Sequence, residues 1–414
     1  MPAFLTHWRI LIETARRSQD AGSDLGSLIV DAAALQRRLQ GSSSSSTGSR
    51  PSTPPQTTPA GAVWDTGPLP EIDYRFPGSD ISAMAYLGAL APDITSYHKL
   101  HFRNKISDIY QKRWTSKYQS ADRHLPWAKL LHSNRSGDLL LAFLEQSADI
   151  PSPALRSQAL AFCLGYLSHI ATDIALNPWI NALASAYRQQ EITGLFTPLG
   201  PHFYVELCMD EYIAATYFEH DLYSWTNQPW VNYIEPAARN LGIPRTLAAQ
   251  VLELLTSAAE ATYDLKEEQK STFHADYLAG LQRLRLYLAG RGIFRWYIFN
   301  ARIRRRYNDP VIATIAAHRQ DAGIVTFEGA IEYAIRLSER LCRRAISYYA
   351  SLRNTRATAE ERNMRRTLLS EDLRNWDLST GYSLDISFDQ EITLRFLHNW
   401  IHFDDLWQKE AMSI

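Results

Sequence analysis

The sequence predicts an all-α protein with a disordered insert near its N-terminus. Apolar residues recur at helical spacing over most of the 414-residue chain. No alternation of strand and helix patterns occurs, and both glycine-rich phosphate loops, GxGxxG and GxxxxGK followed by Ser or Thr, are absent. Only Gly381–Leu394 alternates apolar and polar residues, so it is the one candidate strand. Together these observations favour a bundle of many helices.

The N-terminal region contains two predicted helices and then a segment without helical pattern. Residues 3–18 and 24–39 both place apolar residues on one face. The segment Gly41–Ala62 is rich in Ser, Thr and Pro, has no aromatic residue and has almost no apolar residue. It cannot bury enough surface to offset the entropy of ordering. We therefore predict a flexible insert over residues 41–62.

Helical periodicity resumes after the insert and continues through most of the chain. The predicted helices are 79–94, 100–118, 125–147, 152–188, 201–220, 244–263, 268–290, 293–306, 309–319 and 327–353. Residues 355–414 give no clear pattern beyond an amphipathic stretch, "LHNWIHFDDLW".

Charge and cysteine content narrow the functional class. The formal net charge is -1, so no global basic field attracts nucleic acid, and no nucleic-acid partner is expected. The three cysteines, Cys163, Cys208 and Cys342, are too few and too scattered for a disulfide framework, which indicates a reducing compartment. The first residues lack the order of regions of a secretory signal. We therefore expect a cytoplasmic protein; its oligomeric state is not indicated.

Two predicted helices carry polar groups at a regular spacing. In "AFCLGYLSHIATDIALNPWIN" the residues His169, Asp173 and Asn177 follow one another at intervals of four and so share one face of an otherwise apolar helix. The helix beginning at Pro201 repeats the pattern with a second set, His202, Glu206 and Asp210.

These groups need partners, since a buried carboxylate without one is costly. A cation between the helices would serve both sets, and zinc accepts imidazole nitrogen and carboxylate oxygen. The alternative is a satisfied core pair, which is the usual role of a single buried His and Asp. Two such helices, both in apolar sequence, favour a metal.

The chain resembles the zinc-dependent phospholipase C family, an all-α fold that holds up to three zinc ions in a cleft. The stretches that resemble it, in chain order, are "MPAFLTHWRI", "AYLGALAPDI", "LLHSNRSGDLLLAFL", "GYLSHIATDIALNPWIN" and "PHFYVELCMDEYIA". The resemblance covers residues 1–220 and, weakly, 327–350. It implies the metal ligands His7, Asp93, His132, His169, Asp173, His202 and Glu206, with Asp173 bridging two ions.

The sequence departs from the family pattern at two points. The signature HxxxDxxxHP ends in Asn177 instead of histidine, and an amide oxygen is a poorer zinc ligand than imidazole. Asn177 is thus a candidate weak ligand. Asp210 is a candidate replacement ligand or a group that orients a histidine, and Thr172 is a candidate only for orienting a histidine. The secreted enzymes also use an N-terminal tryptophan as ligand, whereas this chain begins with Met1. We expect one to three Zn²⁺ ions, with the best-supported site at His132, His169 and Asp173.

The resemblance implies a phosphodiester hydrolase with a phospholipid or other phosphodiester substrate. Asp93 is the candidate catalytic residue, which would orient or deprotonate the attacking water; the alternative is a capping or turn role beside Pro92. Two other functions remain open. One is a related zinc phosphoesterase that acts on nucleotides or small phosphodiesters, and the other is a non-catalytic helical interaction module with a degenerate metal site.

The same resemblance gives the expected domain organisation. A phospholipase C-like helical domain would span residues 1–264, and a helical extension over 265–414 would pack on the same core. Within the extension, Leu281–Tyr307 mixes arginines with aromatic residues. Such a segment can lie on an anionic membrane, which would give peripheral contact; the alternative is a core helix with solvated arginines.

Overall fold

The described part of the chain is helical, as predicted. The structure, a computed structural model, describes residues 4–20, 80–98, 127–188, 202, 205–206, 208–210, 212–213, 245–288, 315, 326–379 and 381–383. Its principal helices are α1 (Phe4–Asp20), α4 (Asp80–Gly88), α5 (Ala91–His98), α7 (Trp127–Ser133), α8 (Ser136–Ala148), α9 (Pro153–Arg188), α12 (Arg245–Tyr263), α13 (Glu267–Leu288), α17 (Phe327–Arg353) and α18 (Ala359–Leu373). A small antiparallel hairpin pairs β1 (Trp376–Asp377) with β2 (Tyr382–Ser383).

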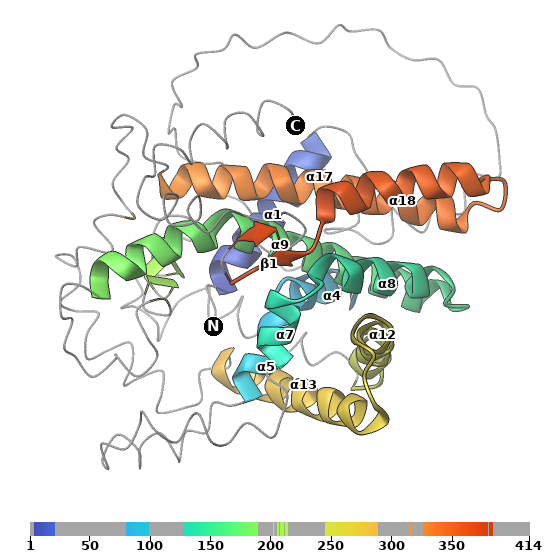
Figure 1. The fold of residues 1–414 in the computed structure, drawn as a ribbon, viewed down its shortest axis with the longest axis horizontal. Coiled ribbons are helices and arrows are strands. Elements are labelled where there is room, and N and C mark those ends of the chain that lie inside the picture. The colour runs from blue at the N-terminus through green and yellow to red at the C-terminus, as the bar shows by residue number, and fades with distance from the viewer. Residues whose placement is uncertain are drawn as a thin grey trace, which may run out of the picture.

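The centre of the fold is α9, a helix of 36 residues. It packs along α17 on one side and against α4 on another, and α1 crosses both α9 and α17 (Figure 1). The remaining helices surround this centre, α8 lying between α9 and α12 and α5 between α7 and α13. Because α9 is covered by several helices, its residues 158–180 are buried all the way round, which explains its nearly continuous apolar sequence.

The contact between α4 and α9 is a close approach of two backbones. A Cβ atom added at Gly165 would lie 1.9 Å from the carbonyl oxygen of Ala85, and one added at Gly88 would lie 2.0 Å from that of Phe162. Each helix thus places a glycine under the backbone of the other. No larger residue fits at these two positions without separating the helices.

The predicted helix over 125–147 is wrong in one respect, because the chain forms two helices there. The break lies at Ser133–Arg135, where Arg135 adopts a left-handed conformation with φ 49°. The hydroxyl of Ser136 then donates a hydrogen bond to the Trp376 carbonyl at 3.0 Å, and the Trp376 amide donates back to it at 3.0 Å. The turn therefore places the start of α8 under the C-terminal hairpin.

The C-terminal region differs from the sequence expectation as well. Helix α18 was not predicted, although Thr358 caps it by accepting a hydrogen bond from the Glu361 amide at 3.1 Å. Of the candidate strand Gly381–Leu394, only Tyr382–Ser383 is a described strand, and its partner Trp376–Asp377 was not predicted. Helices from both sides of residue 264 share one hydrophobic core, but the division at that residue stays a prediction.

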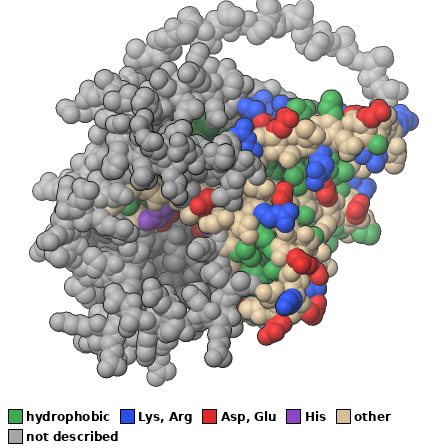
Figure 2. All heavy atoms as spheres, viewed as in Figure 1, with side chains coloured by type: hydrophobic (Ala, Val, Ile, Leu, Met, Phe, Trp, Pro, Cys, Tyr) green, Lys and Arg blue, Asp and Glu red, His purple; other side chains and the backbone are tan. Residues whose placement is uncertain are grey.

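Several predicted features lie outside the described residues. They are the insert 41–62, the helices 24–39, 100–118 and 293–306, the helix 309–319 except residue 315, most of the helix 201–220, all but the first residues of the basic segment 281–307, and the amphipathic stretch "LHNWIHFDDLW". On the face drawn in Figure 2, acidic and basic side chains are interspersed over the described helices.

Among the described helices, one is long and apolar enough to span a membrane, judged by its length and composition alone. It covers Pro153–Asn181, and its most apolar window is 100% buried inside the protein. That burial is the pattern of a core helix, and length and composition alone are weak evidence for a span.

Candidate metal centre

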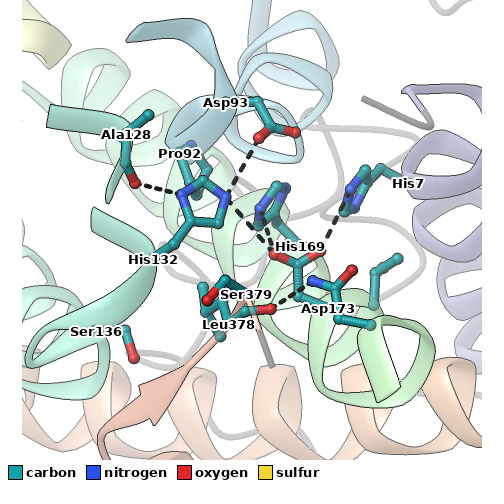
Figure 3. Close-up of polar contacts among 12 residues, drawn as sticks. His7, Pro92, Asp93, Ala128, His132, Ser136, His169, Asp173, Leu378 and Ser379 are labelled. Carbon is teal, nitrogen blue, oxygen red and sulfur yellow. Dashed lines mark hydrogen bonds and ion pairs between the residues drawn. The ribbon is translucent and has the colours of Figure 1, made fainter. Parts of the chain in front are cut away.

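Four helices bring five of the predicted ligands together. His7 comes from α1, Asp93 from α5, His132 from α7, and His169 and Asp173 from α9 (Figure 3). Figure 3 shows the three imidazole rings and two carboxylates turned toward a shared space. The most exposed of these side chains is His132, at 14%, so the cluster lies almost wholly inside the protein.

The two carboxylates each face imidazole nitrogens. Asp173 Oδ2 lies 3.2 Å from His169 Nε2 and 3.7 Å from His132 Nε2, whereas its Oδ1 lies 3.6 Å from His7 Nε2. On the other side, Asp93 Oδ1 lies 3.2 Å from His132 Nε2. Two groups of three ligands result, His7 with His169 and Asp173, and Asp93 with His132 and His169, each with its ligand atoms within 4.8 Å of one another.

These separations match the spacing of ligands around zinc. Zinc binds imidazole nitrogen and carboxylate oxygen at about 2.0–2.2 Å, so two ligand atoms in a tetrahedral site lie roughly 3.3 Å apart. The nitrogen–oxygen separations of 3.2 to 3.7 Å fall at or slightly above that value. They are also longer than most charge-assisted hydrogen bonds between nitrogen and oxygen.

The outer nitrogens of two histidines are already held by backbone carbonyls. His169 Nδ1 lies 2.9 Å from the Ala89 carbonyl oxygen, and His132 Nδ1 lies 2.6 Å from that of Ala128. A carbonyl can only accept a hydrogen bond, so the proton is on Nδ1 in both rings. In the neutral rings Nε2 therefore presents a lone pair to the carboxylates, an arrangement typical of metal-binding histidines.

The remaining histidine, His7, lies against His169. Their rings are stacked with centroids 4.1 Å apart and planes 6° from parallel. Burial, together with the charge of His169, lowers the pKa of His7 to about 3, so this imidazole is neutral at pH 7. His7 Nδ1 and His169 Nε2 are buried atoms that form no hydrogen bond within the described residues.

The negative charges of the two carboxylates are only partly balanced by the histidines of the cluster. Burial acts to raise the pKa of Asp173 and of Asp93. The charge of His169 outweighs burial at Asp173, and the contact with His132 does so at Asp93, so both carboxyl pKa values are lowered. Burial also acts to lower the pKa of His169, but the charges of Asp173 and Asp93 raise it to about 9. With His7 neutral, a buried cation fits both the charge and the lone pairs of this site.

The comparison with protein families agrees with this geometry. Residues 68–240 match the family model described as zinc-dependent phospholipase C. This segment, less than half of the chain, is similar to the zinc-dependent phospholipase C family. The searches of curated proteins and of solved structures returned no match. This match points to zinc as the metal and supports a hydrolase of the phospholipase C type.

The segment that matches the zinc-dependent phospholipase C family contains every predicted ligand except His7. His7 comes from a helix before this segment, and the structure nevertheless places it 3.6 Å from Asp173. One of the two three-residue groups therefore includes a residue outside the family match, and the other lies wholly inside it.

The second predicted pair, His202 and Glu206, belongs to neither three-residue group among the described residues. His202 Nε2 is 3.3 Å from Glu206 Oε1, as expected for residues one helical turn apart. His202 Nδ1 lies 2.9 Å from Asn181 Oδ1, a contact that the sequence analysis missed. The His202 side chain is 37% exposed, so this imidazole is more accessible than those of the buried cluster.

The residues predicted to support the ligands have diverse contacts. Asn177 donates its amide Nδ2 to the Leu378 carbonyl. Asp210 Oδ1 accepts hydrogen bonds from both the amide and the hydroxyl of Thr6, each at 3.0 Å, and so fixes the first turn of α1 beside His7. Thr172 donates its hydroxyl to the Ser168 carbonyl of its own helix, and its expected role in orienting a histidine stays a prediction.

Proposed function

We propose that the protein is a zinc-dependent, phospholipase C-like hydrolase that cleaves a phospholipid phosphodiester. One observation carries the proposal: four helices place three imidazoles and two carboxylates, almost completely buried, with nitrogen–oxygen separations suited to zinc. The family match over residues 68–240 supports the same chemistry.

Each ligand group has a defined part in the proposal. His7, His169 and Asp173 would hold one ion, and Asp93 and His132 would supply ligands for a neighbouring ion, with Asp173 between the two. His169 appears in both three-residue groups, but its single lone-pair nitrogen would bind only one of the two ions. Zinc bound there would polarise the phosphate oxygens and lower the pKa of a bound water. The carbonyls of Ala89 and Ala128 keep the Nε2 atoms of His169 and His132 directed at the site.

Asp93 is the proposed catalytic group. It is in the first turn of α5, where a capping role was the alternative, but its carboxylate faces His132 Nε2 at 3.2 Å. Its low pKa keeps it ionised at neutral pH, so it can accept a hydrogen bond from a water and orient that water toward phosphorus. Its His132 contact fixes the direction of the carboxylate.

The first experiment measures zinc per chain by elemental analysis in the wild type and in His169→Ala. His169 belongs to both three-residue groups, so its loss should remove most of the bound zinc. A matched control is His274→Ala, which replaces a histidine on α13 outside both groups and should leave the zinc content unchanged. Wild-type protein that binds no zinc, even after zinc is added, would refute the proposal.

The second experiment separates the candidate activities. Wild type and Asp93→Asn are assayed with phosphatidylcholine vesicles, a small chromogenic phosphodiester and single-stranded DNA. We expect diacylglycerol release by the wild type and at least a 100-fold loss in Asp93→Asn. Turnover of DNA alone would favour the nucleotide-directed phosphoesterase, and stoichiometric zinc without any turnover would favour the interaction module.

If the substrate is a phospholipid, the protein must reach a membrane surface, so we also propose a cellular location. The three cysteines are all free and buried, which supports a reducing compartment, and we place the protein in the cytoplasm with peripheral contact to membranes. Co-sedimentation with anionic and with neutral vesicles tests this contact. Failure to sediment with either would contradict peripheral binding.

A further inference from the structure

A C-terminal segment lies beside the candidate metal centre and contacts two of the helices that carry the predicted ligands. We call residues 374–379 and 381–383 the strap; it contains β1, β2 and the turn between them. The strap lies well beyond residues 68–240, the part of the chain that matches the family. Figure 3 shows Leu378 and Ser379 of the strap beside His132 and Asp173.

Leu378 joins α7 to α9 through its two backbone groups. Its amide donates a hydrogen bond of 2.6 Å to the carbonyl of His132 on α7, and its carbonyl accepts one from the side-chain amide of Asn177 on α9. Its side chain is completely buried. A single strap residue therefore bridges the helix of His132 and the helix of His169 and Asp173.

Helix α7 needs such a contact because it has only seven residues. An isolated helix of that length is not stable in water, so its position depends on tertiary contacts. The His132 carbonyl is one of the last four in α7, which lack partners within the helix. The Leu378 amide satisfies this carbonyl, and the Ser133 hydroxyl adds a second bond of 3.0 Å to Asp377 Oδ1.

On α9 the strap is fixed over one helical turn. Asn181 donates its side-chain amide to the Ser379 carbonyl at 2.9 Å, one turn beyond Asn177. Between them, Pro178 lies directly under Gly381, whose φ is +78° and where an added Cβ would be 2.7 Å from two carbons of the proline ring. Position 381 therefore excludes any side chain.

The same contact extends to the second predicted pair of ligands. Because the Asn181 amide nitrogen donates to Ser379, its Oδ1 is the atom that faces His202 Nδ1, at 2.9 Å. An amide oxygen can only accept, so the proton of a neutral His202 is on Nδ1 and its Nε2 is free toward Glu206. The strap thus orients ligands in two places.

We infer that the strap is a positioning element of the metal centre and that Asn177 acts as its anchor through Nδ2, not as a metal ligand through its oxygen. The inference rests on the proposed function, since it concerns ligands of the same site. It assigns a role to a segment outside the family match and explains why an amide suits position 177: it can donate to a carbonyl, which a carboxylate cannot do.

The test is Asn177→Asp, for which the two roles predict opposite results. A carboxylate is a better zinc ligand than an amide oxygen, so a ligand at this position would tighten zinc binding. As an anchor, the carboxylate would face the Leu378 carbonyl without a proton to donate and would release the strap. We expect zinc affinity, measured by competition with a chelator, to fall roughly 10-fold.

Gly381→Ala tests the strap without changing a residue that faces the site. It should weaken zinc binding to a similar extent and should shift the visible absorption bands of the Co²⁺-substituted protein, which report ligand geometry. Leu369→Ala is the control, because it removes a buried side chain of α18 and lowers stability without touching the strap contacts. Thermal unfolding followed by circular dichroism shows whether each variant is folded.

The outcomes separate the strap from the metal centre itself. Zinc binding in the wild type with unchanged or tighter binding in Asn177→Asp and Gly381→Ala would overturn the positioning role alone. An equal loss in Leu369→Ala would also overturn it, because the loss would then follow from stability. A wild type without zinc would overturn both the strap inference and the proposed function. If Asn177→Asp does not fold, Asn181→Ala, at a less buried anchor, replaces it in the comparison.

Discussion

Replacing Gly165 by alanine tests whether the close packing of α4 on α9 determines the geometry of the metal centre. The added Cβ would lie 1.9 Å from the Ala85 carbonyl oxygen and 2.8 Å from the Ala89 amide nitrogen. Contacts below about 3.0 Å are not tolerated, so α4 must move away by roughly 1 Å or more. The Ala89 carbonyl on the same segment holds His169 Nδ1 at 2.9 Å. A shift of that size takes it out of hydrogen-bond range.

Two effects then add in Gly165→Ala. Overpacking costs about 1–3 kcal/mol, and loss of the hydrogen bond to His169 costs about 1 kcal/mol more. We therefore expect the free energy of unfolding, measured in urea on the metal-free protein, to fall by about 2–4 kcal/mol. Because the Ala89 carbonyl also orients the nitrogen that we propose as a zinc ligand, zinc affinity should fall roughly 10- to 100-fold.

The matched control is Gly329→Ala, the same change at an exposed position in the first turn of α17. Alanine favours helix there, so stability should stay constant or rise slightly, and zinc affinity should not change. If Gly165→Ala retained the stability and the zinc affinity of the wild type, the argument from backbone contact would be refuted. A loss of stability with zinc affinity intact would refute only its extension to His169.

Three further predictions concern pH and helix ends. Zinc binding should strengthen up to about tenfold per pH unit between pH 6 and 8, because zinc displaces the proton of His169, whose pKa is raised to about 9 by Asp173 and Asp93 against the effect of burial. Arg17→Gln should cost about 1 kcal/mol at pH 7 and almost nothing at pH 2. Burial acts to raise the pKa of Glu332, but the Arg17 guanidinium outweighs burial and lowers this pKa. The ion pair therefore stabilises the folded protein at pH values above the pKa of Glu332 in the unfolded chain. This stabilisation is lost as the pH falls through the pKa of Glu332 in the folded protein. Thr326→Ala should destabilise the protein by about 1 kcal/mol, since its hydroxyl accepts the Gly329 amide at 3.0 Å at the start of α17.

Each of these has a direct check. The pH dependence of zinc binding is measured by competition with a chelator at several pH values, and a zinc affinity independent of pH would contradict the prediction. The effect of Arg17→Gln on the free energy of unfolding is measured in urea at pH 7 and pH 2, with Arg356→Gln on the surface as control. An equal loss of stability at both pH values would exclude the ion pair as its cause. Thr326→Ser keeps the capping oxygen and should restore the stability lost in Thr326→Ala.

The part of the metal centre on α9 could be predicted from the sequence because it depends on local geometry. His169 and Asp173 are one helical turn apart, so a helix of any origin places them side by side. His7, Asp93 and His132 are on separate helices, and only the resemblance to a family indicated that they meet there. The structure brings them together, while their role as ligands stays a prediction.

The strap could not be predicted, because its main contacts are made by backbone atoms. The amide and carbonyl of Leu378 are common to almost every residue, and the partner Asn177 is 201 residues away. Spacing alone therefore suggested a weak ligand at position 177. Two other omissions did have signals: the polar turn before Ser136 indicates a helix break, and Thr358 followed by Glu361 is a capping box that predicts α18.

The position of Leu378 in the chain has a consequence for the order of maturation. The ribosome makes all five side chains of the cluster by residue 173, but the residue that joins α7 to α9 follows 201 residues after Asn177. A nascent chain can fold its early helices first, as large proteins generally do. The bridge between α7 and α9 can close only after residue 378 has left the ribosome, so the final arrangement of His132 relative to Asp173 is a late event of biosynthesis.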